Sequence, residues 1–68
     1  MSYLVVVERG ETGCGAYVPD LPGCAAAGET RDEVLRLIQE AISRHVEGPK
    51  RQGLPVPEPR SRGELISA

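Results

Sequence analysis

The stretch from Tyr17 to Glu33 places the strongest limits on the fold of this chain. It reads Y-V-P-D-L-P-G-C-A-A-A-G-E-T-R-D-E. Val18 precedes a proline and is therefore pushed toward extended backbone, while the proline, aspartate and glycine that follow favour tight turns. Thr30 and Glu33 have the spacing of a capping box, which predicts a helix starting near Arg31. This stretch therefore predicts the end of a strand, a turn, a short strand and a helix, in that order.

An amphipathic pattern follows the predicted helix start. We predict a helix over residues 31–47, ended by Gly48-Pro49, because its apolar side chains fall on one half of a 3.6-residue wheel. That half contains Val34, Leu35, Leu37, Ile38, Ala41, Ile42, His45 and Val46. A lone histidine near a helix end is more often packed or bonded to a carbonyl than catalytic, so His45 is given a structural role.

The N-terminal part of the chain predicts strands over residues 3–9, 14–18 and 24–28. Successive side chains of a strand point to opposite faces, and the run from Tyr3 to Val7 is apolar on both. One helix covers one face of a small sheet, so we expect the second face to meet another copy of the chain. The glycines at 10, 13 and 15 are interpreted as hairpin residues, because a phosphate-binding loop is followed by a helix and here a strand follows.

Length and composition support association. The chain has 68 residues without Phe or Trp, and a domain of this size buries only ~60% of its unfolded surface. We therefore expect a homo-oligomer, a dimer or higher. No signal peptide and no stretch of the ~20 apolar residues needed to cross a membrane is visible. Cys14 and Cys24 are interpreted as buried or half-buried free thiols, and the expected location is cytoplasmic.

No catalytic chemistry is predicted. The acidic residues do not form the cluster that a two-metal nuclease needs, and no Cys or Ser has the spacing of a partner for the single His. We expect no metal, no cofactor and no enzymatic activity. The net charge of −2 offers no field that would draw nucleic acid.

The central stretch resembles the signature of the HicB-like antitoxin family, in which a Tyr, a P-D-L-P-G-C run and a G-[DE]-T-x-x-E helix start follow in this order. The matching residues, interpreted as structural, are Tyr17, Pro19, Leu21, Pro22, Gly23, Cys24, Gly28, Thr30 and Glu33. The resemblance implies a truncated ribonuclease H-like α+β fold of the type β-β-β-α-β. A proline-rich connection over 48–61 then leads to a last strand over 63–67, parallel to the first. The implied strand order is 3-2-1-4.

The resemblance also implies a binding role. HicB-like antitoxins pair with a small basic ribonuclease toxin of the HicA type and block its active site. The candidate contacts are Glu8, Glu11, Asp20 and Glu29, although the turn position of Asp20 favours bonds to its own backbone amides. The chain ends after the predicted last strand, so we expect no C-terminal DNA-binding domain and no direct DNA binding. The alternative is a solitary oligomeric scaffold without a toxin partner.

Overall fold

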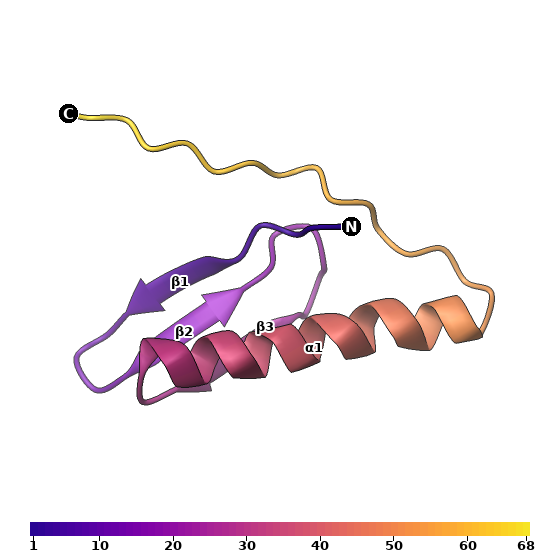
Figure 1. Ribbon diagram of the computed structural model, residues 1–68, viewed down its shortest axis with the longest axis horizontal. Coiled ribbons are helices and arrows are strands. Elements are labelled where there is room, and N and C mark those ends of the chain that lie inside the picture. The colour runs from indigo at the N-terminus through magenta and orange to yellow at the C-terminus, as the bar shows by residue number, and fades with distance from the viewer.

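The computed structural model describes all of residues 1–68 and contains three strands followed by one long helix (Figure 1). The strands are β1 (Val6–Arg9), β2 (Cys14–Tyr17) and β3 (Ala25–Gly28), and the helix is α1 (Arg31–Arg51). Each strand pairs antiparallel with the next, which gives the order β1-β2-β3. The predicted α+β class is confirmed. No helix of the chain is both long and apolar enough to cross a membrane.

The β1 ladder is shorter than the strand predicted over residues 3–9. Val6 is its first paired residue, opposite Tyr17 at the end of β2. If the register continued, Leu4 would lie opposite Pro19, which has no N–H to donate and opens a turn. Residues 3–5 therefore run ahead of the ladder without a partner strand.

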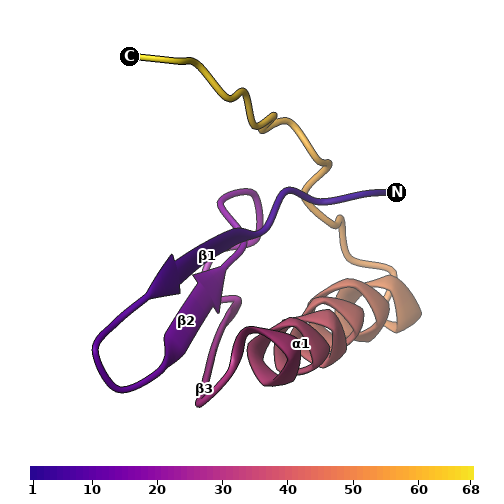
Figure 2. The ribbon, with the colours of Figure 1, turned by 60° about the vertical axis from the view of Figure 1, so that its left-hand side comes forward.

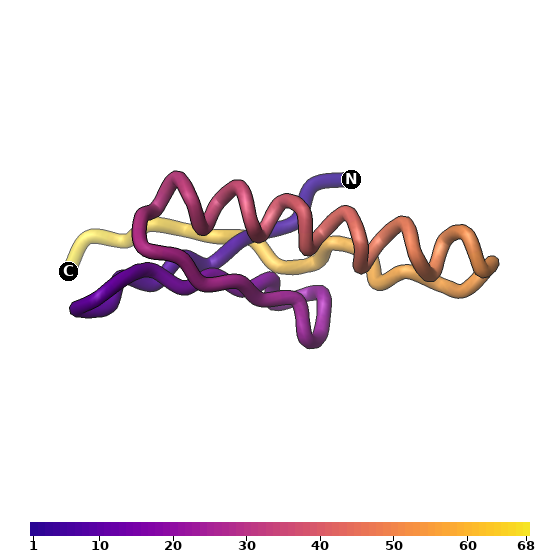
Figure 3. The backbone as a smooth tube through the Cα atoms, turned by 90° about the horizontal axis from the view of Figure 1, so that it is seen from below, coloured from indigo at the N-terminus to yellow at the C-terminus, as the bar shows by residue number.

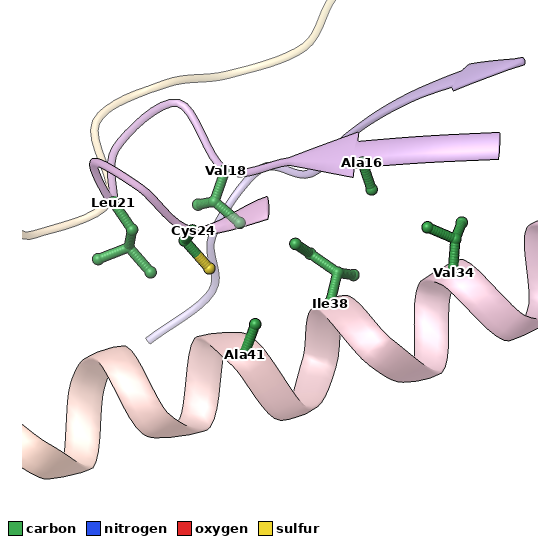
Figure 4. Close-up of a cluster of buried hydrophobic side chains, with 7 residues drawn as sticks. All are labelled: Ala16, Val18, Leu21, Cys24, Val34, Ile38 and Ala41. Carbon is green, nitrogen blue, oxygen red and sulfur yellow. The ribbon is translucent and has the colours of Figure 1, made fainter. Parts of the chain in front are cut away.

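Helix α1 covers one face of the sheet, and the core lies between the two (Figure 4). Ile38 and Val34 are among the largest side chains that are fully withdrawn from solvent. The seven buried residues are Ala16, Val18, Leu21, Cys24, Val34, Ile38 and Ala41. The buried residues of α1 follow the 3.6-residue period of the helix, as the apolar pattern predicts, and Ala16 and Val18 follow the two-residue period of extended backbone. Leu21 and Cys24 come from the turns between β2 and β3.

The other face of the sheet has no element over it (Figure 2). Because Ala16 is buried against the helix, its neighbours Gly15 and Tyr17 point to this open face. The strand register places Val6, Tyr17 and Ala25 in one row across the three strands. Tyr17 is 43% exposed there. The open face is therefore apolar along the Val6 row and lined mostly by small side chains, with Glu8 at its hairpin edge.

Helix α1 begins where the capping signal predicts. The Thr30 side chain accepts a hydrogen bond of 3.1 Å from the Glu33 backbone N–H, which satisfies one of the free donors of the first turn. The reciprocal bond of a capping box, from the Thr30 N–H to the Glu33 carboxylate, does not form. The Glu33 side chain lies beside Gly28 instead, where an added Cβ would be only 3.2 Å from it.

The predicted end of the helix at 47 is wrong, because α1 continues through Gly48-Pro49 to Arg51. Pro49 has no N–H to donate to the His45 carbonyl, so α1 loses one i→i−4 hydrogen bond but is not ended there. The helix is terminated by Gly53, which follows the C-cap residue Gln52 and has a left-handed φ of 71°. The Gly53 N–H donates to Lys50 and the Leu54 N–H donates to Pro49. These two bonds form a Schellman motif.

The last strand predicted over 63–67 does not form, so the order 3-2-1-4 is not observed within the chain. Residues 54–68 run back toward the β1–β2 hairpin without regular structure (Figure 3). The segment has no backbone N–H to donate to a strand ladder at Pro55, Pro57 and Pro59. Hydrogen bonds that involve side chains fix its position instead. The Tyr3 hydroxyl donates to the Pro57 carbonyl, and Asp20 binds Arg60 and Ser61.

Candidate functional site

Three of the four predicted contact residues lie at one end of the molecule. We call this the hairpin end and define it as residues 8–15 together with residues 27–31. Glu8 lines one hollow there, and Glu11 and Glu29 line the next. The two hollows share Arg9, Gly10 and the turn that follows, so they form one continuous surface.

Two glycines build this surface. The Gly10 N–H donates to the Gly13 carbonyl at 2.7 Å, which closes the turn between β1 and β2. A Cβ placed on Gly13 would lie 2.6 Å from the Gly28 carbonyl oxygen. The hairpin turn therefore sits directly against the junction of β3 and α1. This close approach brings Glu11 of the turn and Glu29 of the junction to the same hollow.

The carboxylates of the hairpin end are free of partners within the chain. The one ion pair of the structure joins Glu47 to Arg51 at the far end of α1, over 3.9 Å. Glu8, Glu11 and Glu29 accept no hydrogen bond from a side chain or from the backbone in the described contacts, and all three residues are exposed. Exposed and unpaired carboxylates are available to a partner that carries positive charge.

The hairpin end is not uniformly acidic. Arg9 and Arg31 line the same hollow as Glu11 and Glu29. These two arginines are not among the contact residues predicted from the sequence. They adjoin Glu8 and Thr30 in the sequence, but only the fold shows that both face one hollow. The hollow therefore carries both positive and negative charges. A partner with the complementary charge pattern can dock in fewer orientations here than on a surface of one sign.

Asp20 lies apart from the other three, at the opposite end of the sheet. Its carboxylate accepts hydrogen bonds from the backbone N–H groups of Arg60 (2.8 Å) and Ser61 (2.7 Å) and from the Ser61 hydroxyl (2.8 Å). The expectation that Asp20 bonds the amides of its own turn is wrong. Asp20 is an anchor for the C-terminal segment, and no local pattern reveals a contact across 40 residues.

The anchor predicts a pH dependence. Bonds from the Ser61 and Arg60 backbone hold the pKa of Asp20 below its usual value of 3.8. A depressed folded-state pKa means that the stabilisation is complete above the unfolded-state pKa and is lost as pH falls through the folded one. We expect the amide resonances of Arg60 and Ser61 to shift with a midpoint below pH 3.8 in an NMR titration.

Asp20→Asn should abolish that titration, because the amide side chain carries no charge to lose. Asp32→Asn is the matched control, since Asp32 is the other aspartate and lies in the first turn of α1. If the Arg60 and Ser61 amides titrated equally in wild type and Asp20→Asn, the anchor would be assigned to the wrong carboxylate.

The proline-rich turn positions the anchor. The Leu21 N–H donates to Val18 and the Cys24 N–H donates to Leu21, so two consecutive β-turns make up the loop. Pro22 and Gly23 occupy the central positions of the second turn, and the Gly23 φ of 79° is that of a type II turn. Leu21 lies between the two turns, is only 2% exposed, and packs its side chain into the core. The loop is thereby fixed, with Asp20 facing the C-terminal segment.

The remaining candidates for chemistry are accounted for by structure. His45 Nδ1 lies 2.9 Å from the Ala41 carbonyl, to which the ring donates. Cys14 is half-buried and Cys24 buried, both as free thiols, as predicted. Burial raises the pKa of the Cys24 thiol and so lowers its reactivity. No three His, Cys, Asp or Glu side chains gather closely enough to hold a metal ion.

Comparison with known proteins gives a consistent result. Residues 3–68 match the family model described as HicB_like antitoxin of bacterial toxin-antitoxin system. The chain is 38% identical to a UPF0150 protein of Thermoplasma acidophilum over 68 residues, and 33% identical to Antitoxin HicB 2 of Photorhabdus laumondii over 66 residues. Among solved structures it is similar to a chain of a HicA3 and HicB3 toxin-antitoxin complex, with a TM-score of 0.68 and 30% identity.

The fraction of the relative's length that the alignment covers differs from one relative to the next. The alignments cover 98% of this chain and 96% of the Thermoplasma protein, but 97% of this chain and only 48% of the Photorhabdus antitoxin. The chain also spans only 36% of a 14.9 kDa protein of Haemophilus phage HP1, to which it is 44% identical over 48 residues. In the complex, the match covers 87% of this chain and 70% of the solved one.

Proposed function

The chain belongs to the HicB-like antitoxin family, and from that premise we propose that it binds a HicA-type ribonuclease toxin and covers its active site. The observation that carries the proposal is the likeness, at 30% identity and a TM-score of 0.68, to a chain of a HicA3 and HicB3 complex. The chain acts by occupying a surface, so the proposal requires no enzymatic step and no cofactor. The β1-β2-β3 meander with α1 is its truncated ribonuclease H-like scaffold.

The hairpin end is the proposed contact surface. Glu8, Glu11 and Glu29 offer unpaired carboxylates to a basic toxin, and Arg9 and Arg31 set the orientation. Electrostatic complementarity of this kind raises the association rate and rejects wrong partners. Asp20 is left out of this surface because its carboxylate already holds Arg60 and Ser61.

Charge reversal tests this surface. The combined variant Glu8→Lys, Glu11→Lys and Glu29→Lys should weaken binding to the cognate HicA-type toxin by roughly a hundredfold. The loss should be smaller in high salt, because salt already screens the attraction in the wild type. The affinity is measured by titration calorimetry with the purified small basic protein that co-purifies with this chain. Relief of toxin-induced growth arrest on co-expression gives the second readout.

The control reverses three exposed glutamates away from the hairpin end and outside residues 63–67, namely Glu40, Glu47 and Glu58. It changes the net charge equally, so a purely long-range effect would weaken binding in both variants alike. Unchanged toxin affinity in the hairpin-end variant would refute the acidic contact surface. Failure of the wild-type chain to co-purify with any small basic neighbour would refute the toxin partner itself.

A second function, a solitary oligomeric scaffold, is favoured by the open face of the sheet. Val6, Tyr17 and Ala25 form an apolar row there that no element of the chain covers. A second copy of the chain is the proposed cover. Light scattering should then give at least a dimeric mass, and a monomer at every concentration would refute the homo-oligomer. Both functions are proposed for the cytoplasm, where the two free thiols stay reduced, and neither involves direct reading of DNA.

A further inference from the structure

The C-terminal segment ends in two apolar side chains without a partner. Leu65 is 103% exposed and Ile66 is 89% exposed, the highest values among the large hydrophobic residues. The segment before them is not loose, because the Asp20 carboxylate holds Arg60 and Ser61 by three hydrogen bonds. The anchor therefore fixes the segment as far as Ser61, shortly before Leu65 and Ile66.

The outer edge of strand β1 also lacks a partner. The strand pairs with β2 on one side only, so the backbone groups of its other side have no partner. The run Val5-Val6-Val7 is β-branched and favours extended backbone. An exposed edge of this kind is a template for another strand, and stable proteins cover it.

The chain's own C-terminal segment does not cover this edge. A Cβ placed on Gly63 would lie 3.2 Å from Leu4 Cδ1, so the segment crosses the Leu4 side chain. Leu4 has the same parity as Val6 and so points to the open face, out of the plane in which strands pair. Beyond Gly63 the segment departs from β1 (Figure 2).

We propose that residues 63–67 add as a fourth strand to the free β1 edge of a second copy of this chain. The exchange is reciprocal, because each copy carries one free edge and one free segment, and a twofold axis closes it. This inference does not depend on the toxin partner. It also differs from the proposed pairing of open faces, because it uses a backbone edge and the C-terminal segment.

The side-chain pattern of the segment fits such a strand. Neighbouring residues of a strand point to opposite faces. Of Leu65 and Ile66, one would therefore join Val5 and Val7 on the helix side, and the other would join Val6 on the open face. Added strands gain affinity from main-chain hydrogen bonds and specificity from alternating side chains. The β1 edge has apolar side chains on both faces of the sheet. A strand that pairs with it therefore needs one apolar residue for each face, and two consecutive apolar residues supply them.

Light scattering and analytical ultracentrifugation of the full chain test the exchange. Leu65→Ser with Ile66→Ser should raise the dimer dissociation constant roughly tenfold or more. Leu54→Ser is the matched control, because Leu54 is 54% exposed but lies outside the exchanged segment. A monomeric wild type, or equal dissociation constants for wild type and the tail variant, would overturn the proposal.

An isotope-filtered NOE experiment separates the second copy from the chain's own edge. In a mixture of labelled and unlabelled protein, methyl contacts from Leu65 and Ile66 to Val5, Val6 or Val7 should appear between copies. Contacts confined to one chain would show that the segment closes on its own β1, and the exchange would be refuted. A dimer that Tyr17→Ser weakens and the tail variant leaves intact would refute it as well, and would favour the open face.

Discussion

Replacing Ile38 by alanine is expected to lower the free energy of unfolding by about 2–4 kcal/mol. Ile38 is 2% exposed and projects from α1 into the centre of the core (Figure 4). Removing its side chain loses the burial of three carbon atoms and leaves a cavity that the neighbours only partly fill. Only seven residues are buried in this chain, so the loss is a large share of the total stability.

Urea unfolding followed by circular dichroism measures the effect, with the protein concentration held fixed because association adds to apparent stability. Leu37→Ala is the matched control. Leu37 is the preceding residue of α1 and is half-buried, but it lies outside the group packed against the core. Both changes replace a branched aliphatic side chain by alanine in the same helix. Equal destabilisation by the two would mean that the core does not lie where Ile38 points.

The parts of the fold that local physics determines could be predicted from the sequence. The stripe of Val34, Ile38 and Ala41 is visible as a 3.6-residue period, and these are the buried residues of α1. The cap at Thr30 and the turns around Pro22 and Gly23 follow from the side chains themselves. Each of these features depends on residues within one or two turns of each other, so no tertiary information was needed.

Two of the three errors lie where distant segments decide the outcome, and the third is a choice between two local helix stops. Gly48-Pro49 reads as a stop, but Gly53 can take a left-handed conformation that completes a Schellman motif, and the helix runs on to it. Residues 63–67 have strand-forming side chains, but a strand also needs a ladder partner in plane. The anchor at Asp20 joins residues that are 40 positions apart, and no pattern near Asp20 signals it.

In the candidate site, too, the features set by nearby residues could be predicted and those set by contacts between separate elements could not. The exposure of Glu8, Glu11 and Glu29 could be inferred from their places in a hairpin and before a helix. Their meeting at one end of the molecule depends on the approach of Gly13 to Gly28, which is a contact between separate elements. Arg9 and Arg31 enter the surface for the same reason.

Replacing Gly13 by alanine should therefore damage both the fold and the hairpin end. The added Cβ would lie 2.6 Å from the Gly28 carbonyl oxygen, a distance that forces the backbone to move. Overpacking of this kind costs about 1–3 kcal/mol of stability. We expect a loss of that size in urea unfolding, and a weaker affinity for the proposed toxin because Glu11 and Glu29 move apart.

Gly10→Ala is the control that isolates the close approach. A Cβ on Gly10 would lie 3.5 Å from the Gly13 carbonyl oxygen, an ordinary contact, and neither glycine has a positive φ. Both variants reduce the conformational freedom of the unfolded chain equally, so that effect cancels in the comparison. The difference between them then reports the steric conflict at the β3–α1 junction alone. If Gly13→Ala were as stable as Gly10→Ala and bound toxin equally well, the hairpin turn would not be packed on that junction, and the site built there would lose its basis.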